Sequence, residues 1–165
     1  MFPEELLRLD LSQILVVLAL AASPISELRG AIPVAIAGFY FPWYYAFPLA
    51  IIGNLLPVPL ILLFFNAMSK AICKTETGER MLQWLLERTR RRGKLVEQYE
   101  RIGLALFVAV PLPMTGAWTG SLAAVLLGLK FRHAFLSILV GIIIAGIIVT
   151  CATLLGWSVF VMGGF

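Results

Sequence analysis

Charged side chains are scarce in this chain of 165 residues: they make up 13% of the sequence, whereas hydrophobic residues make up 61%. The mean hydropathy is +0.96, which excludes an ordinary soluble domain. The sequence also holds one histidine and two cysteines. The histidine has no cysteine or carboxylate nearby, and no serine elbow or phosphate-binding glycine loop is present. The sequence therefore predicts no metal site, no cofactor and no enzyme.

Four stretches carry no charge at all, namely 11–26, 30–69, 102–129 and 133–165. All but the first exceed the roughly 20 residues that one helical membrane span needs. We therefore expect an all-α polytopic membrane protein. Cys73 falls in a polar segment and Cys151 in an apolar one, so the two would lie in different surroundings and are expected to be free thiols.

The first apolar stretch is too short to cross a membrane. Leu11–Ala22 ends at Ser23-Pro24, an N-cap and first-turn proline that restart a helix. This pattern predicts a re-entrant helical hairpin whose second leg runs from Pro24 to about Tyr40. A single kinked span over residues 11–37 is the alternative.

The aromatic segment 39–45 has the composition of an interfacial belt. A span from about Tyr45 to Asn66 follows, and Pro57 and Pro59 predict that its helix is discontinuous. Residues 70–101 then form a basic, helical connector. Its cluster Arg88, Arg90, Arg91, Arg92 and Lys94 predicts contact with anionic lipids. Nucleic acid is not expected as a partner.

The second half repeats the first: a short apolar leg, a proline-rich turn at 111–120, a second leg and a final span. A shift of about 90 residues places Gly30 on Gly120, and a shift of 88 places Gly53 on Gly141. Each hairpin returns to its own side and each span crosses, so the repeats would be inverted. We expect a single membrane domain over 1–165, with a first repeat at 11–69, a cytoplasmic connector at 70–101 and a second repeat at 102–165. The basic loops then share the cytoplasmic side, and both termini face outward.

Glu27 and Arg29 are the only charges between Leu11 and Ser69, and such groups cost about 2.5–3.5 kcal/mol each on membrane-insertion scales. Burial raises the proton affinity of a carboxylate and a nearby guanidinium lowers it, so the net direction for Glu27 stays open. Arg29 offers a planar fork for carboxylate or phosphate. As the alternative, the two charges neutralise each other, because residues two apart face the same side of an extended segment.

Weaker candidates for substrate binding or proton coupling lie near the turns: Asn54, Thr115, Gly116, Trp118 and Thr119. The prolines expected to shape the hairpins are Pro24, Pro33, Pro57, Pro59, Pro111 and Pro113. Asn and Thr also bond neighbouring helices in a bilayer, so a structural role stays open for each of them.

Three stretches resemble the small multidrug export protein family of prokaryotic membrane proteins: SELRGAIP at 26–33, GNLLPVP at 53–59 and PLPMTGAWTG at 111–120. The resemblance spans nearly the whole chain and implies a multi-pass transporter of the prokaryotic inner membrane, with no cargo named. The chain is also distantly similar to the DedA superfamily, whose paired hairpins and acidic and arginine residues are linked to proton-dependent movement of lipid phosphates. Gly116 and Trp118 stand roughly where a second charged pair would be sought, so two-sided charge chemistry would need a second copy of the chain.

The sequence therefore predicts proton-linked export or flipping of an amphipathic or anionic substrate, such as a drug or a lipid phosphate, across the bilayer. Glu27 and Arg29 would form the centre of its site. The competing hypothesis is a non-transporting membrane scaffold or assembly factor in which the Glu27–Arg29 pair is structural.

Overall fold

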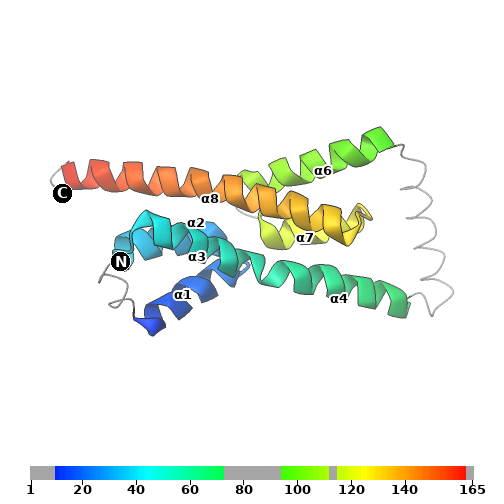
Figure 1. Ribbon diagram of the computed structural model, residues 1–165, viewed down its shortest axis with the longest axis horizontal. Coiled ribbons are helices and arrows are strands. Elements are labelled where there is room, and N and C mark those ends of the chain that lie inside the picture. The colour runs from blue at the N-terminus through cyan, green and yellow to red at the C-terminus, as the bar shows by residue number, and fades with distance from the viewer. Residues whose placement is uncertain (1–9, 73–93, 112–114, 163–165) are drawn as a thin grey trace, which may run out of the picture. The chain divides into compact units, whose positions relative to one another are not determined.

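The computed structural model describes residues 10–72, 94–111 and 115–162, and Figure 1 labels their helices. Within these ranges every regular element is a helix, which confirms the predicted all-α class. The elements are α1 (Leu11–Ala22), α2 (Glu27–Pro33), the π-helix η2 (Val34–Gly38), α3 (Trp43–Leu55), α4 (Pro57–Ile72), α6 (Lys94–Ala109), α7 (Ala117–Leu126) and α8 (Phe131–Met162). The basic cluster at 88–92 lies outside the described residues.

The chain divides into two compact units. Unit 1 comprises residues 1–55 and 143–165, and unit 2 comprises residues 56–142. Unit 1 therefore holds α1, α2, η2, α3 and the second part of α8, whereas unit 2 holds α4, α6, α7 and the first part of α8.

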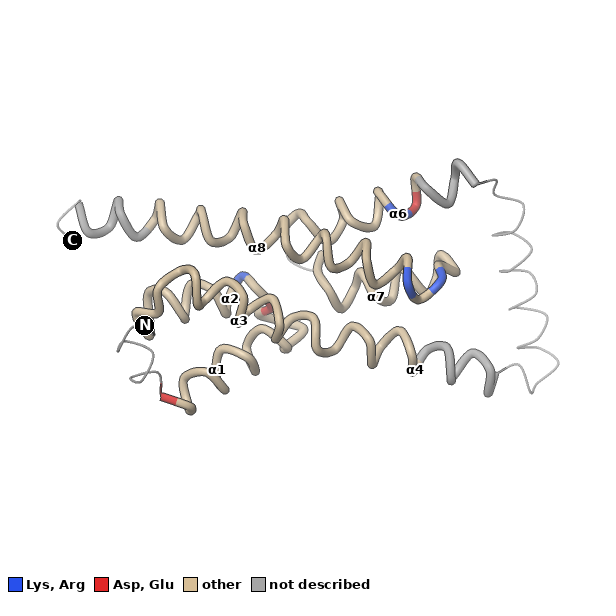
Figure 2. Tube along the Cα trace, viewed as in Figure 1, with Lys and Arg blue, Asp and Glu red and all other residues tan. Residues whose placement is uncertain are grey.

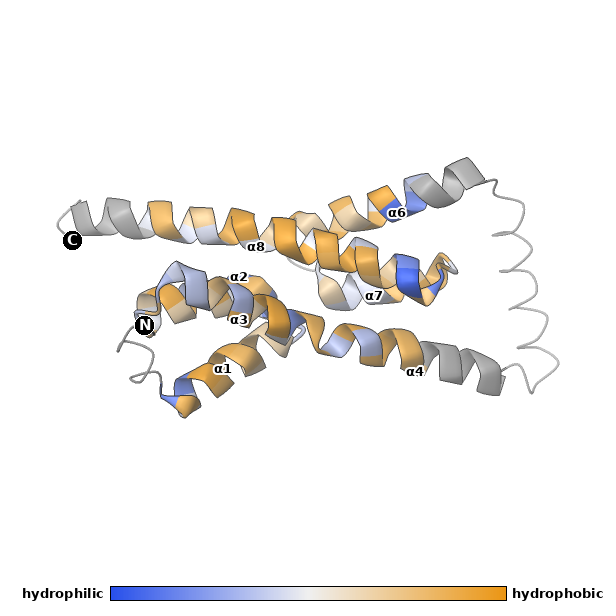
Figure 3. Cartoon of the chain, in the orientation of Figure 1, coloured by the Kyte–Doolittle hydropathy of each residue, from blue (hydrophilic) through white to orange (hydrophobic). Residues whose placement is uncertain are grey.

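Two helical stretches are long and apolar enough to cross a membrane. They are Trp43–Phe64, with a mean hydropathy of 2.2, and Phe131–Gly156, with a mean hydropathy of 2.8. Figure 3 shows α8 as hydrophobic along most of its described length, with hydrophilic positions at its start. By length and composition both stretches fit the hydrocarbon core of a bilayer, which is about 30 Å thick.

The distribution of residue sizes also fits a membrane. Large aliphatic side chains such as Leu60, Leu136 and Ile147 are exposed, while alanines such as Ala50 and Ala134 are fully buried. In water this arrangement would leave much apolar surface uncovered. In lipid it is expected, because membrane helices bring small residues to their interfaces and turn large apolar ones outward.

In unit 1, α2 packs against both α1 and α3. The chain reverses at Ser23–Ser26, which favours the predicted helix pair over the kinked span of residues 11–37. Gly53 lets α3 approach α1 closely: a Cβ on Gly53 would lie 2.7 Å from the Cβ of Ala21 and 3.0 Å from the carbonyl oxygen of Leu18.

Two boundaries differ from those predicted. The helix after the first turn begins at Glu27 and not at Pro24, because the side chain of Ser26 is still hydrogen-bonded back to α1, donating to the carbonyl oxygen of Leu20. By contrast, the proline-containing span is interrupted at Leu56, between α3 and α4, which agrees with the predicted discontinuous helix. Helix α6 begins at Lys94, so the last part of the predicted connector is continuous with the first leg of the second half.

Three residues of the aromatic segment before the first span are exposed, and Phe41 is buried. Tyr40, Trp43 and Tyr44 are all solvent- or lipid-accessible, and the rings of Trp43 and Tyr44 meet edge to face with centroids 6.0 Å apart. Tyr40 has a positive φ of 58°, which turns the chain into α3. Amphipathic aromatic rings of this kind suit the boundary between lipid and water.

In unit 2, α7 packs against α4 and α6. Two glycines bring helices close to α6: a Cβ on Gly120 would meet the side chain of Val108, and a Cβ on Gly141 would lie 2.7 Å from the carbonyl oxygen of Ala105. Small residues thus set the packing here as they do in unit 1. Cys151 is a free, exposed thiol on α8, and Cys73 lies outside the described residues.

Candidate functional site

Glu27 is the first residue of α2 and is buried, with 6% of its surface exposed. Its φ is 46°, a left-handed conformation that glutamate rarely adopts and that costs on the order of 1–3 kcal/mol. Strained backbone of this kind persists only where the surrounding structure enforces it, and it concentrates at functional sites. Burial and strain together identify Glu27 as the leading candidate.

The turn that holds Glu27 is fixed by hydrogen bonds to the end of α1. The hydroxyl of Ser26 donates to the carbonyl oxygen of Leu20 at 2.7 Å, and the amide of Glu27 donates to the carbonyl oxygen of Ser23 at 3.2 Å. The amide of Gly30 in turn donates to the carbonyl oxygen of Ser26 at 3.0 Å. These bonds anchor the chain on both sides of the residue, so the backbone of Glu27 is held at one place in the helix pair.

Arg29 is half-buried on the same helix. Residues that lie two positions apart on a helix do not face each other. The geometry therefore differs from that of the extended segment, in which the two charges would share a side. In the described part of unit 1 the charged residues are Asp10, Glu27 and Arg29, and Figure 2 shows the acidic and basic positions of α2 within otherwise uncharged helices. The local, same-facing neutral pair is therefore not favoured by this helix.

Asn54 lies on α3, in the same unit as Glu27 and Arg29. Its side chain is 2% exposed, and its Oδ1 accepts no hydrogen bond from the described part of the chain. An unsatisfied buried amide oxygen costs about 1–3 kcal/mol. The preceding residue, Gly53, contacts α1 at Leu18 and Ala21, so Asn54 is held where α3 meets the end of α1.

The backbone is irregular next to both polar residues. Pro33 has no amide hydrogen to donate to the carbonyl of Arg29, and the π-helix η2 follows directly. Pro57 likewise has no amide hydrogen to donate to the carbonyl of Gly53. Within a bilayer such backbone is tolerated where it is buried in protein or lines a water-filled cavity.

Unit 1 thus collects a buried carboxylate, a buried amide oxygen and interrupted helices. These oxygens are hydrogen-bond acceptors when Glu27 is ionised, and they suit a proton or a small cation more than an anion. The half-buried guanidinium of Arg29 is the only described group of this unit that would bind an anion through a charged donor.

The other predicted site residues lie in unit 2, where the turn before α7 brings them together. The hydroxyl of Thr119 accepts a hydrogen bond from the amide of Gly116 at 3.0 Å, and the hydroxyl of Thr115 donates to the carbonyl oxygen of Val110 at 2.7 Å. Both threonines thus take part in holding the turn. Trp118 is half-buried in the first turn of α7. A binding role for these residues stays a prediction.

The predicted structural prolines mark changes of direction or element boundaries. Pro24 is exposed in the first turn, Pro57 begins α4, Pro59 lies in the first turn of α4, and Pro111 follows the end of α6. Pro33 is the last residue of α2, and Pro113 lies outside the described residues.

Two features were not predicted from the sequence. The left-handed conformation of Glu27 has no local signal, because glutamate does not favour it. The second feature is a groove between α6 and α7, which has no local signal because it forms only where the two helices pack.

The fold and this site define an all-helical membrane protein with polar groups buried in its apolar core. Residues 27–148 match the family described as "Putative small multi-drug export protein". The chain belongs to this family. Searches among curated proteins and among solved structures give no match. The distant resemblance to the DedA superfamily stays a prediction.

Proposed function

We propose that this protein exports or flips a small amphipathic or anionic substrate across the prokaryotic inner membrane and that the transport is linked to proton movement through Glu27. The observation that carries the proposal is the burial of this carboxylate in a strained turn between two packed helices. An ionisable group in such a place is costly to keep, which favours a functional role. The family to which the chain belongs supports export as the process.

The polar groups of unit 1 support a cycle of protonation and deprotonation at the carboxylate of Glu27. When Glu27 is ionised it would attract a proton or cation, and Asn54 would present its Oδ1 as a second acceptor in the same unit. When Glu27 is protonated the site would carry the single charge of Arg29, which would attract a carboxylate or phosphate on the substrate. Proton binding and anion binding would thereby support each other.

Repeated architecture supports a transporter. In unit 1, Gly53 contacts Leu18 and Ala21; in unit 2, Gly141 contacts Ala105 and Val108. Positions 18, 21 and 53 thus correspond to 105, 108 and 141, a shift of 87 to 88 residues. This equivalence supports two repeats of a re-entrant hairpin plus a span, the second inverted relative to the first. Inverted repeats with broken helices are common in secondary transporters.

The topology can be tested by cysteine accessibility. In a background with Cys73 and Cys151 replaced by serine, we expect Tyr44→Cys to react with a membrane-impermeant maleimide on intact cells. Lys130→Cys should react only after permeabilisation, because basic loops mark the cytoplasmic side. Leu63→Cys, on the apolar span, serves as the unreactive control. Labelling of both test positions from the same side would contradict the inverted arrangement.

The transport itself is tested in liposomes that contain the purified protein and an internal pH dye. We expect a proton flux that depends on an added substrate, with tetraphenylphosphonium as a lipophilic cation and a fluorescent phosphatidic acid as a lipid phosphate. Protein-free liposomes give the background. A scaffold would produce no flux with either probe.

A further inference from the structure

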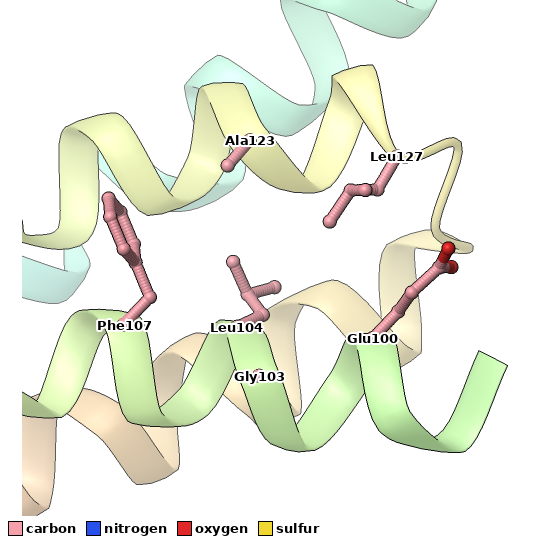
Figure 4. A pocket seen from close by; sticks show the side chains of 6 residues that line it. All are labelled: Glu100, Gly103, Leu104, Phe107, Ala123 and Leu127. Atoms are coloured by element: carbon pink, nitrogen blue, oxygen red, sulfur yellow. The ribbon is translucent and has the colours of Figure 1, made fainter. Parts of the chain in front are cut away.

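Helices α6 and α7 of unit 2 enclose a groove of about 270 Å³. It is lined by Glu100, Gly103, Leu104, Phe107, Ala123 and Leu127, and Figure 4 shows these side chains facing each other across the two helices. Apart from Glu100 the lining is apolar. Leu104 forms a buried floor, whereas Phe107 is exposed toward the surroundings.

The polar groups lie at one end of this groove. Figure 4 shows the carboxylate of Glu100 at the Leu127 end, beside the loop that follows α7. That loop contains Lys130, which is exposed. The groove therefore has an apolar body and one acidic side chain at one end, and the loop beside that end contains a basic residue.

Gly103 leaves part of the groove open. A Cβ built at this position would meet no atom within 4 Å, although the residue lies in the middle of α6. The helix thus lacks a side chain beside the groove, at a position where glycine destabilises the helix relative to alanine.

We propose that this groove binds one acyl chain of an amine-bearing phospholipid, whose ammonium group lies at Glu100 and whose phosphate lies near Lys130. The volume is below the range of about 300–1,000 Å³ that is typical of pockets for drug-sized ligands. A narrow, flexible chain fits such a space better than a polycyclic drug or a helix of another protein. The carboxylate of Glu100 at one end and the lysine of the adjoining loop match the two charges of a zwitterionic headgroup. This lipid site does not depend on Glu27 and goes beyond the proposed transport function.

Native mass spectrometry of the full-length protein in detergent tests the proposal, with palmitoyl-oleoyl-phosphatidylethanolamine as the probe. We expect Gly103→Leu to weaken binding at least about tenfold, which corresponds to about 1.4 kcal/mol, because the added side chain fills the groove. Gly156→Leu is the matched control, since a Cβ on Gly156 also meets nothing within 4 Å. It should bind as the unmodified protein does. Equal affinities of the two variants would overturn the site.

The headgroup assignment has its own measurement. Glu100→Gln should lower the affinity for phosphatidylethanolamine and leave the affinity for phosphatidylglycerol, which has no amine, unchanged. A diazirine in the acyl chain of phosphatidylethanolamine should label residues of α6 and α7 on photolysis. Labelling confined to other helices, or equal losses for both lipids in Glu100→Gln, would contradict the proposed orientation.

Discussion

Replacing Glu27 with glutamine is expected to abolish substrate-dependent proton flux in liposomes while leaving the protein folded and inserted. Glutamine keeps the size and polarity of the side chain but does not titrate. Because the variant retains a polar side chain at a buried position, its unfolding free energy should stay within about 1 kcal/mol of the original. The flux should fall to the level of protein-free liposomes.

Asp10→Asn is the matched control for this experiment. Asp10 is exposed and its side chain forms no hydrogen bond that caps α1, so its replacement should leave the flux unchanged. Arg29→Ala should weaken the response to the fluorescent phosphatidic acid more than the response to tetraphenylphosphonium. Undiminished flux in Glu27→Gln would eliminate this carboxylate as the coupling group.

The structural alternative makes a different prediction. If Glu27 and Arg29 only neutralise each other, removing either one strands a buried charge and costs about 3–5 kcal/mol by analogy with soluble proteins. The double variant Glu27→Gln with Arg29→Gln should then recover the stability. Full transport by this double variant would show that neither residue takes part in the transport mechanism. A double variant that is stable but inactive would support the transport role of Glu27 and Arg29.

The helical class and the spans could be predicted because hydropathy over about 20 residues is a strong signal. The turn after α1 was also predictable from Ser23 and Pro24. The start of α2 was not, because it depends on the hydrogen bond from Ser26 to Leu20. That bond accompanies a turn of three more residues before Glu27. The left-handed conformation of Glu27 is not indicated by any local propensity.

The candidate site was predictable in its residues and less so in its geometry. A charge in an apolar stretch is visible in any sequence, so Glu27 and Arg29 stood out. Whether they share a face depends on the local conformation, and the helix separates them. The role of Thr119 at the start of α7 has a local cause: its hydroxyl accepts a hydrogen bond from the amide of Gly116, the N-cap residue three positions earlier. The third residue of a capping box bonds back to the N-cap in the same way.

The groove between α6 and α7 was hidden for a different reason. Its lining comes from residues 100–107 and 123–127, so it exists only once the two helices pack. The open space at Gly103 depends on where α7 lies. Sequence periodicity describes one helix at a time and does not tell how far apart two helices lie.

Replacing a glycine with alanine adds one methyl group, and its effect on the unfolding free energy should have opposite signs at tightly packed and at open positions. At Gly53 and Gly141 the new Cβ would lie within 2.7 Å of atoms of the neighbouring helix, including the carbonyl oxygen of Ala105 for Gly141. Backbone atoms cannot rotate away, so the helices must separate. We expect Gly53→Ala and Gly141→Ala to lower the unfolding free energy by about 1–3 kcal/mol each, as overpacking does.

Gly103→Ala and Gly156→Ala are the matched controls, because a Cβ at either position meets nothing within 4 Å. They should raise the stability by up to about 1 kcal/mol through helix propensity alone. Unfolding in detergent, followed by circular dichroism as denaturant is added, measures all four. Similar losses at Gly53 and Gly141 would support equivalent helix contacts in the two repeats, and Gly53→Ala should also reduce proton flux, since α3 carries Asn54 beside this contact. If Gly53→Ala and Gly141→Ala were as stable as the two controls, the close helix packing described here would be wrong, and with it the placement of Asn54 against α1.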